Sequence, residues 1–295
     1  MILEKRIPLV YWLNLIKWDI LIVSGFSPLV FFSSEYFIDL HIPVSIGAFM
    51  GTAIALLLSF KLSQSYDRWW EARKIWGAIV NDSRTFVVQL KSFSGDKNKG
   101  LTNKMSYRQI AWCYSLSQSL RNQNSTKNIS DFISKQELES IKNYANTPLA
   151  LLDNQSQNLS QLHNENVIND FQQIQINNTL VRLCASMGKT ERIKNTAFPK
   201  TYRLTLHLFI YIFLVTLSLA LTEMHSLVEI PLMVFISLPF FLLEKIALSI
   251  QDPFENKPTD TAMTSISRTI EINIKQLLDV EYIPEPITSE KFYML

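Results

Sequence analysis

The side chains that could carry chemistry are few and widely spaced in this sequence. Its histidines stand far apart, with no carboxylate or cysteine at the spacing of a ligand set: His41, His163, His207 and His225. The two cysteines, Cys113 and Cys184, accompany no His or Cys cluster, which argues against a zinc site or a disulfide framework. We therefore expect structural histidines, two reduced thiols facing the cytosol, no metal, no cofactor and no enzymatic activity.

The densest information lies in residues 66–84, which read YDRWWEARKIWGAIVNDSR. On a helix, Trp69, Arg73 and Trp76 would share one face, and Glu71 would lie three residues before Lys74 on another. By residue type alone, tryptophan and arginine just beyond a membrane span are typical of an interfacial belt with snorkelling cations. The density of tryptophan exceeds what anchoring requires.

This stretch resembles the signature of the bestrophin family, in particular of its prokaryotic branch. Two further stretches match, ERIKNTAFP at 191–199 and the segment from EKIA at 244–247 to DPF at 252–254. The resemblance covers nearly the whole chain and is weakest over 95–180. It implies a pentameric ion channel with four membrane helices per subunit and a helical cytosolic domain. It also implies a structural and interfacial role for the motif residues Arg68, Trp69, Trp70, Glu71, Arg73 and Trp76.

Hydrophobic segments must position these residues. The chain has 295 residues, of which 47% are hydrophobic and 18% charged. Residues 42–60 contain no titratable side chain, and residues 204–222 contain only His207. Each segment is long enough to cross roughly 30 Å of hydrocarbon as a helix.

Two more hydrophobic segments are less uniform. Residues 227–243 contain two prolines, which predict a kinked span. Residues 9–32 contain Lys17 and Asp19, which must face protein or water rather than lipid. The sequence therefore predicts four membrane helices.

The distribution of charge predicts the orientation. The short loops 33–41 and 223–229 contain acids and no Lys or Arg, whereas 19 of the 28 basic residues lie between Lys61 and Lys200. By the positive-inside rule, both termini and the central segment are cytoplasmic. We expect a multi-pass protein of the bacterial inner (plasma) membrane whose outer-mouth acids are Glu35, Asp39, Glu223 and Glu229.

The predicted fold is an all-α membrane protein with a helical cytoplasmic domain, assembled as a bestrophin-like homopentamer. Its parts are the N-terminal segment with the first two spans (1–60), the cytoplasmic helical domain (61–202), the third and fourth spans (203–250) and a cytoplasmic C-terminal segment (251–295). Helices are expected over 103–121, 131–144 and 147–187, separated by the breaks at 94–96, 122–128 and 146–148.

One segment of the central domain is unusually rich in amides. Between 154 and 178, thirteen of 25 residues are Asn or Gln. They form either a solvated helix face or the wall of a polar cavity, and their alternation with apolar residues favours the solvated face. The apolar positions expected to pack in this region are Leu152, Leu159, Leu162, Phe171 and Ile174.

The second span offers a stripe suited to a pore. Thr52, Leu56 and Phe60 fall at i, i+4 and i+8, and in a symmetric ring each becomes a ring of side chains. Any helical span has such a stripe. The resemblance favours a pore, because in the family the apolar neck lies just before the tryptophan motif that here occupies residues 66–84. Thr52 stands where a larger aliphatic residue is typical, so the outermost ring should be wetter. A narrow apolar neck excludes ions by dewetting and acts as a gate.

The resemblance also implies a cytosolic aperture, which we assign to Phe198. The acidic outer loops would concentrate cations, so we expect a channel selective for monovalent cations. An anion (chloride) channel of the same architecture and a non-conducting membrane scaffold are the alternatives. Animal bestrophins bind calcium in an acidic run that Glu255 and Asp260 do not reproduce, so we expect no such site. Expected partners are further copies of the chain, membrane lipids and permeant monovalent ions, and the net charge of +2 gives no pull toward nucleic acid.

Overall fold

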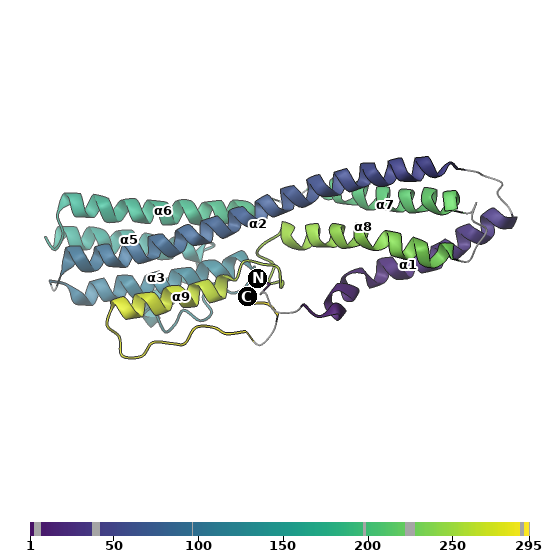
Figure 1. Cartoon of the computed structure of the whole chain (residues 1–295). Helices are drawn as coiled ribbons and strands as arrows, with labels where there is room; N and C mark the ends of the chain where they lie inside the picture. Colours follow the sequence, from purple (N-terminus) through teal and green to yellow (C-terminus); the bar gives the residue numbers. More distant parts are fainter. Residues whose placement is uncertain are drawn as a thin grey trace. The chain divides into compact units, whose positions relative to one another are not determined.

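The computed structural model describes the chain from Met1 onward except residues 3–6, 37–41, 96, 197–198, 222–227, 290–291 and 295. The secondary-structure elements in the described part are α-helices, which confirms an all-helical protein (Figure 1). In chain order they are α1 (Leu9–Tyr36), α2 (Val44–Ser94), α3 (Lys99–Leu120), α4 (Lys135–Ile141), α5 (Thr147–Asn164), α6 (Asp170–Asn195), α7 (Lys200–Leu221), α8 (Glu229–Gln251) and α9 (Met263–Leu277).

The chain forms two compact units, each with its own core. The first, here called the membrane unit, consists of Lys5–Trp69 and Ala197–Asp252. The second, the bundle unit, consists of Met1–Glu4, Trp70–Thr196 and Pro253–Leu295. Residues of α2 up to Trp69 belong to the membrane unit and later ones to the bundle unit.

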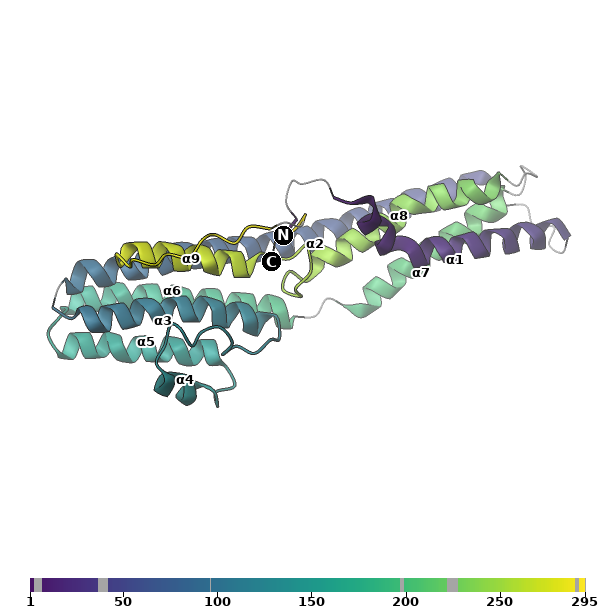
Figure 2. The same ribbon diagram turned by 90° about the horizontal axis from the view of Figure 1, so that it is seen from below.

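The membrane unit contains helices that are long and apolar enough to span a membrane. In the described residues the candidate spans are four and lie in α1, α2, α7 and α8, as the sequence predicts. Figures 1 and 2 show α1, α7 and α8 running side by side in this unit. Pro239 lies inside α8, whereas Pro231 lies in its first turn, where proline is tolerated.

Close packing of α2 against α7 depends on glycine. A Cβ added at Gly51 would lie 3.1 Å from the Phe213 ring, and one at Gly47 would lie 3.5 Å from the Leu217 side chain. Ile54 and Leu58, on nearby turns of α2, are buried in the same apolar cluster. One face of α2 is therefore closed by α7.

The bundle unit surrounds a large apolar core. Trp76 and Phe86 of α2 and Trp112 of α3 are fully buried there. The core also takes Phe254 and one face of α9. The residues after Asp252, predicted as a separate C-terminal segment, thus pack into the same unit as the central domain.

The predicted single helix over 147–187 is wrong. The structure ends α5 at Asn164 and starts α6 at Asp170. Between them Asn166 adopts a left-handed conformation with φ of 54°, which asparagine tolerates better than most residues. Asn169 then forms a capping box with Gln172, in which each side chain bonds the other residue's backbone N–H. The chain therefore breaks where amides can satisfy helix ends.

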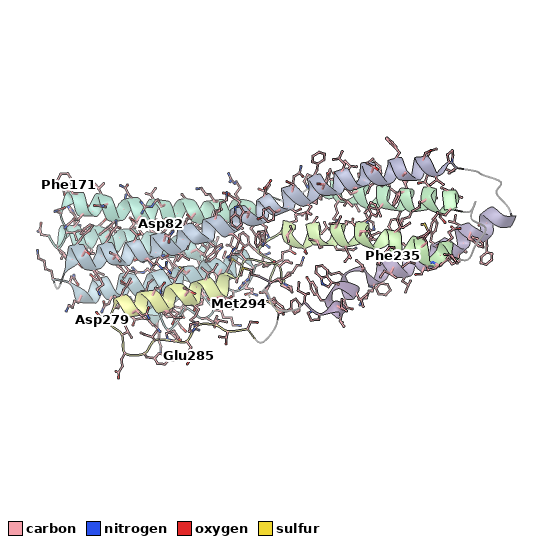
Figure 3. The ribbon with its side chains drawn as sticks, in the orientation of Figure 1. Asp82, Phe171, Phe235, Asp279, Glu285 and Met294 are labelled. Carbon is pink, nitrogen blue, oxygen red and sulfur yellow. The ribbon has the colours of Figure 1, made fainter. Side chains whose placement is uncertain are left out.

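This break changes which apolar residues are buried. Leu152, Leu159 and Leu162 of α5 are in the core, as expected. Phe171 and Ile174 of α6 are 83% and 58% exposed, so their expected packing is wrong (Figure 3). The buried face of α6 instead carries Ile176, Leu180, Leu183 and Met187.

The two cysteines are free and lie in different surroundings. Cys113 is fully buried in α3, and burial raises the pKa of its thiol to about 12 although contacts with Ser83 and Gln109 oppose the shift. Cys184 is exposed on α6.

Candidate functional site

The predicted neck residues lie on the face of α2 opposite to the one that α7 closes. Thr52 is exposed, and Leu56 and Phe60 are 57% and 56% exposed. The hydroxyl of Thr52 donates to the carbonyl oxygen of Ala48 at 2.9 Å, so its own helix already satisfies the proton. An apolar stripe with one satisfied hydroxyl is therefore presented outward from the chain.

A buried cation follows this stripe directly. Lys61 is 1% exposed and points to the opposite side of α2, where its Nζ donates to the Gln251 side-chain oxygen. The same ammonium lies 5.9 Å from the centroid of the Tyr202 ring. Sequence reasoning missed Lys61, because a lysine directly after an apolar segment is equally typical of a side chain that snorkels to the membrane surface.

Two of the stretches that carry the resemblance make contact in the membrane unit. Arg68 of the tryptophan motif donates to Asp252 of the DPF stretch at 3.3 Å. These residues are far apart in sequence, so the contact connects α2 to the end of α8.

Three charged side chains inside the candidate spans, Asp19, Glu244 and Lys245, are paired, whereas Lys17 is exposed and its ammonium lies 5.9 Å from the centroid of the Trp18 ring. Asp19 is 4% exposed and lies 3.0 Å from Lys245, which confirms that it faces protein. Glu244 is 3% exposed, and Nδ1 of His207 lies 3.0 Å from both of its carboxylate oxygens. Such pairs offset the cost of placing charge among apolar helices.

The remaining motif residues divide between the two units. Trp69 is partly buried in the membrane unit, whereas Arg73 is partly buried and Trp76 fully buried in the bundle unit. Trp70 is 47% exposed. Glu71 pairs with Lys74 at 2.7 Å, as their spacing predicts.

Of the predicted outer-mouth acids, the structure describes only the side chain of Glu229. It is the first residue of α8, 1% exposed, and accepts a hydrogen bond of 2.8 Å from Ser218. Its expected place in an open acidic loop is therefore wrong, because α7 and α8 enclose it. The side chain of Glu35, and Asp39 and Glu223, lie outside the described residues, as does Phe198, the predicted aperture.

The described residues contain no group of three or more His, Cys, Asp or Glu side chains suited to hold a metal ion. Of the two acids after the DPF stretch, Glu255 pairs with Lys257 and Asp260 is fully buried. Burial raises the pKa of Asp260.

Comparison with known proteins gives consistent matches over most of the chain. The family described as Bacterial/Fungal Bestrophin protein matches residues 13–276. The voltage-dependent anion channel-forming protein YneE of Escherichia coli (strain K12) is 28% identical over 273 residues, which are 92% of this chain and 89% of that protein. The voltage-dependent anion channel-forming protein mll4386 of Mesorhizobium japonicum is 27% identical over 244 residues, 83% of this chain and 78% of that protein. A solved bacterial bestrophin homologue from Klebsiella pneumoniae is 25% identical, covers 90% of this chain and 100% of its own, and superposes with a TM-score of 0.85.

Proposed function

The chain belongs to the bacterial and fungal bestrophin family, and from that premise we propose that it is an ion channel whose path is enclosed by the α2 helices of five copies. The relatives named above as channel-forming proteins support conduction rather than catalysis. A ring of identical subunits turns each residue of an inward stripe into a ring of side chains.

The observation that carries this proposal is that one face of α2 is packed against α7 while the opposite face is exposed. Glycines and buried aliphatic residues pack one face against α7, while Thr52, Leu56 and Phe60 remain open on the other. An exposed apolar stripe on a helix already anchored on its other side is suited to line a shared axis. Leu56 and Phe60 would form the dewetted neck, and the Thr52 ring would keep acceptor oxygens at its outer end.

For the permeant ion, the proposal is an anion channel, the alternative that the sequence placed second. The names of the relatives favour anions. The buried ammonium of Lys61 is one residue beyond Phe60, and although it points to the other side of α2, where it donates to Gln251, its positive charge favours an anion over a cation at this end of the stripe. This field weakens less with salt than that of an exposed charge.

Cation conduction is the second candidate. The outer loops contain acids and no bases, and in a pentamer these charges would repeat around the mouth. One of them, Glu229, is enclosed and bonded to Ser218, which reduces the exposed negative charge. The two candidates differ in the sign of one measurable quantity, the reversal potential.

The distribution of basic residues supports a topology with both termini and the bundle unit in the cytoplasm, in the bacterial inner membrane. An aromatic ring at Phe198 remains the proposed cytosolic aperture. Phe198→Ala should change conductance or the permeability ratios, and unchanged values for both would remove Phe198 from the path.

Reconstitution of the purified chain in planar bilayers tests the channel and its selectivity together. Under asymmetric sodium chloride, an anion channel gives a reversal potential near the chloride equilibrium potential, and replacing chloride by gluconate abolishes the current. A potential near the sodium value, sensitive to replacement of sodium by a bulky cation, would establish the cation candidate instead. No current under any gradient would favour the non-conducting scaffold.

Two neck variants test the path itself. Leu56→Ala and Phe60→Ala remove side chains from the proposed constriction, so current at a fixed voltage should rise about tenfold as the neck hydrates. Phe235→Ala is a matched control, because Phe235 of α8 is 72% exposed and lies away from the stripe. Equal currents in the wild type, both neck variants and the control would contradict the assignment of the neck.

A further inference from the structure

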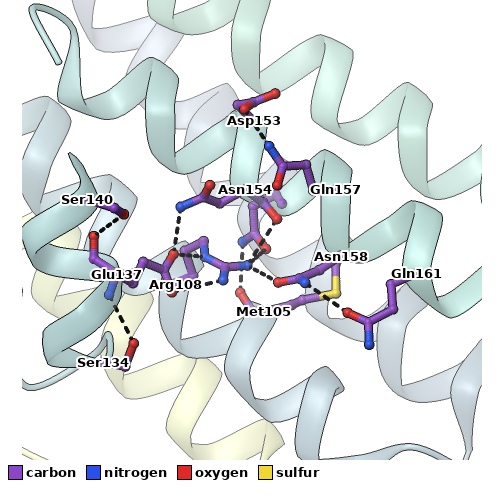
Figure 4. Close-up of polar contacts among 11 residues, drawn as sticks. Met105, Arg108, Ser134, Glu137, Ser140, Asp153, Asn154, Gln157, Asn158 and Gln161 are labelled. Carbon is purple, nitrogen blue, oxygen red and sulfur yellow. Dashed lines mark hydrogen bonds and ion pairs between the residues drawn. The ribbon is translucent and has the colours of Figure 1, made fainter.

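A polar pocket opens in the bundle unit among α3, α4 and α5 (Figure 4). Its volume of about 340 Å³ lies within the range of small-molecule sites. All of its lining residues are polar or charged, and one wall consists of Asn154, Gln157 and Asn158. Part of the amide-rich segment therefore lines a cavity, which is the alternative that the sequence pattern disfavoured.

The floor of the pocket is held rigidly by a buried arginine. Arg108 is 2% exposed, and its Nε and Nη2 donate to the two carboxylate oxygens of Glu137. Its Nη1 donates to the side chain of Asn158 at 2.7 Å and also bonds Gln155. A buried ion pair contributes little stability compared with apolar packing, but it fixes the polar groups around it.

The orientation of two amides leaves acceptors open to the pocket. The side-chain nitrogen of Asn154 donates to Glu137 at 3.0 Å, and that of Gln157 donates to Asp153 at 2.7 Å. Both residues line the pocket, and among the described residues no hydrogen bond reaches either side-chain carbonyl oxygen, so each oxygen can accept from a ligand. These two oxygens can accept hydrogen bonds from a ligand that carries O–H or N–H donors.

The rim supplies a second positive charge, Lys104, which also acts on Glu137 through space. Lys104 of α3 lines the pocket, is exposed, and has no ion-pair or hydrogen-bond partner among the residues that the structure describes. The charge of Arg108 is matched by Glu137, so the pocket has an excess of one positive charge. A ligand with a single negative charge fits this balance.

We propose that this pocket binds a small carboxylate that also carries hydroxyl groups. The carboxylate pairs with the ammonium of Lys104, and the hydroxyls donate to the carbonyl oxygens of Asn154 and Gln157. Charge-assisted hydrogen bonds of the first kind are roughly twice as strong as neutral ones, so Lys104 supplies most of the affinity and the amides supply selectivity. The site is independent of whether the membrane unit conducts anions, cations or no ions.

Three probes of equal carbon number separate these contributions in calorimetric titration of the full-length protein in detergent. Sodium glycerate has both groups, propionate has only the carboxylate, and glycerol has only hydroxyls. We expect saturable heat with glycerate, and a Kd about tenfold higher or more for the other two probes. The absence of saturable binding by glycerate, or equal affinities for all three, would overturn the proposal.

Variants locate the binding. Lys104→Met should weaken glycerate binding about tenfold and leave glycerol unchanged. Gln157→Met should weaken glycerate but not propionate. Lys127→Met is the matched control, because Lys127 is an exposed lysine outside the pocket, in the connection before α4. Glycerate affinity that is the same in Lys104→Met as in the control would place the binding elsewhere, and Arg108 is left intact because its loss threatens folding.

Discussion

The two units of this chain differ in how far they bury their large aromatic side chains. The bundle unit encloses core aromatics such as Phe86 and Trp112 without exposure, although Phe171 of α6 remains 83% exposed. The membrane unit presents comparable side chains outward, with Phe49 73% and Phe235 72% exposed. The bundle unit therefore carries a complete core, whereas the membrane unit needs lipid or further copies to cover its apolar surface.

The units resemble each other in how they treat charge. Each encloses an acid that is paired with a cation of another helix, Asp19 with Lys245 in one unit and Glu137 with Arg108 in the other. In both, the acid is 8% exposed or less. Apolar surface thus distinguishes the units, while the rule that a buried charge needs a partner applies to both.

The largest expected effect is the difference in stability loss between replacing a buried phenylalanine of the bundle unit and an exposed one of the membrane unit. Phe86→Ala should destabilise the bundle unit by about 3–5 kcal/mol, because it leaves a cavity in a closed core. Phe49→Ala should change the stability of the membrane unit in detergent by about 0.5 kcal/mol or less. Hydrogen exchange resolved by peptide measures each unit separately. Similar losses in the two variants would mean that Phe49 packs in a protein core, and the contrast between the units would fail.

A smaller loss of stability is expected when one partner of an ion pair is neutralised, and it tests whether both units need their charges paired. Glu137→Gln leaves the buried Arg108 without its counter-charge and should destabilise the bundle unit by about 3 kcal/mol. Asp19→Asn leaves Lys245, which is 26% exposed, without its counter-charge and should destabilise the membrane unit by a smaller amount. The double variant Asp19→Leu/Lys245→Met should recover most of the loss, since it removes both charges. Exchange rates in α5 report Glu137→Gln and those in α8 report Asp19→Asn. If the double variant is as unstable as Asp19→Asn, the pair has a role beyond mutual neutralisation.

The smallest effect is the acid sensitivity of the bundle unit. Burial alone would raise the pKa of Glu137, but hydrogen bonds and charge from Arg108, together with Asn154, lower it overall. A carboxyl whose pKa is lower in the folded state stabilises the fold above its unfolded pKa, and this contribution is lost as pH falls through the folded pKa. Each unit of pKa difference is worth about 1.4 kcal/mol.

Exchange of α4 and α5 amides should therefore accelerate as pH falls below the unfolded pKa of glutamate, after correction for the intrinsic pH dependence of exchange. In Glu137→Gln this additional acceleration should vanish. A variant that keeps the wild-type profile would assign the acid sensitivity to another group.

Features determined by local sequence were predictable. Length and hydropathy predicted the four spans. The shielding of Asp19 followed from the cost of charge in a membrane, but its partner Lys245 is far away in sequence and no local pattern identifies it.

Features that depend on packing were not predictable. The exposure of Phe171 depends on how α6 is turned after the break at Asn166, and the enclosure of Glu229 depends on Ser218 of the neighbouring helix. The pocket is formed by three helices whose lining residues are polar by type and equally suited to an open surface. Composition alone could not distinguish a pocket from an open polar surface.

The contrast between the thiols provides a built-in attachment point for spectroscopy. At neutral pH a maleimide dye should react with Cys184 and leave the enclosed Cys113, with its pKa of about 12, untouched. One fluorophore per polypeptide would then be introduced without engineering the sequence. Stepwise photobleaching of single particles would count the polypeptides in each assembly, with five bleaching steps expected.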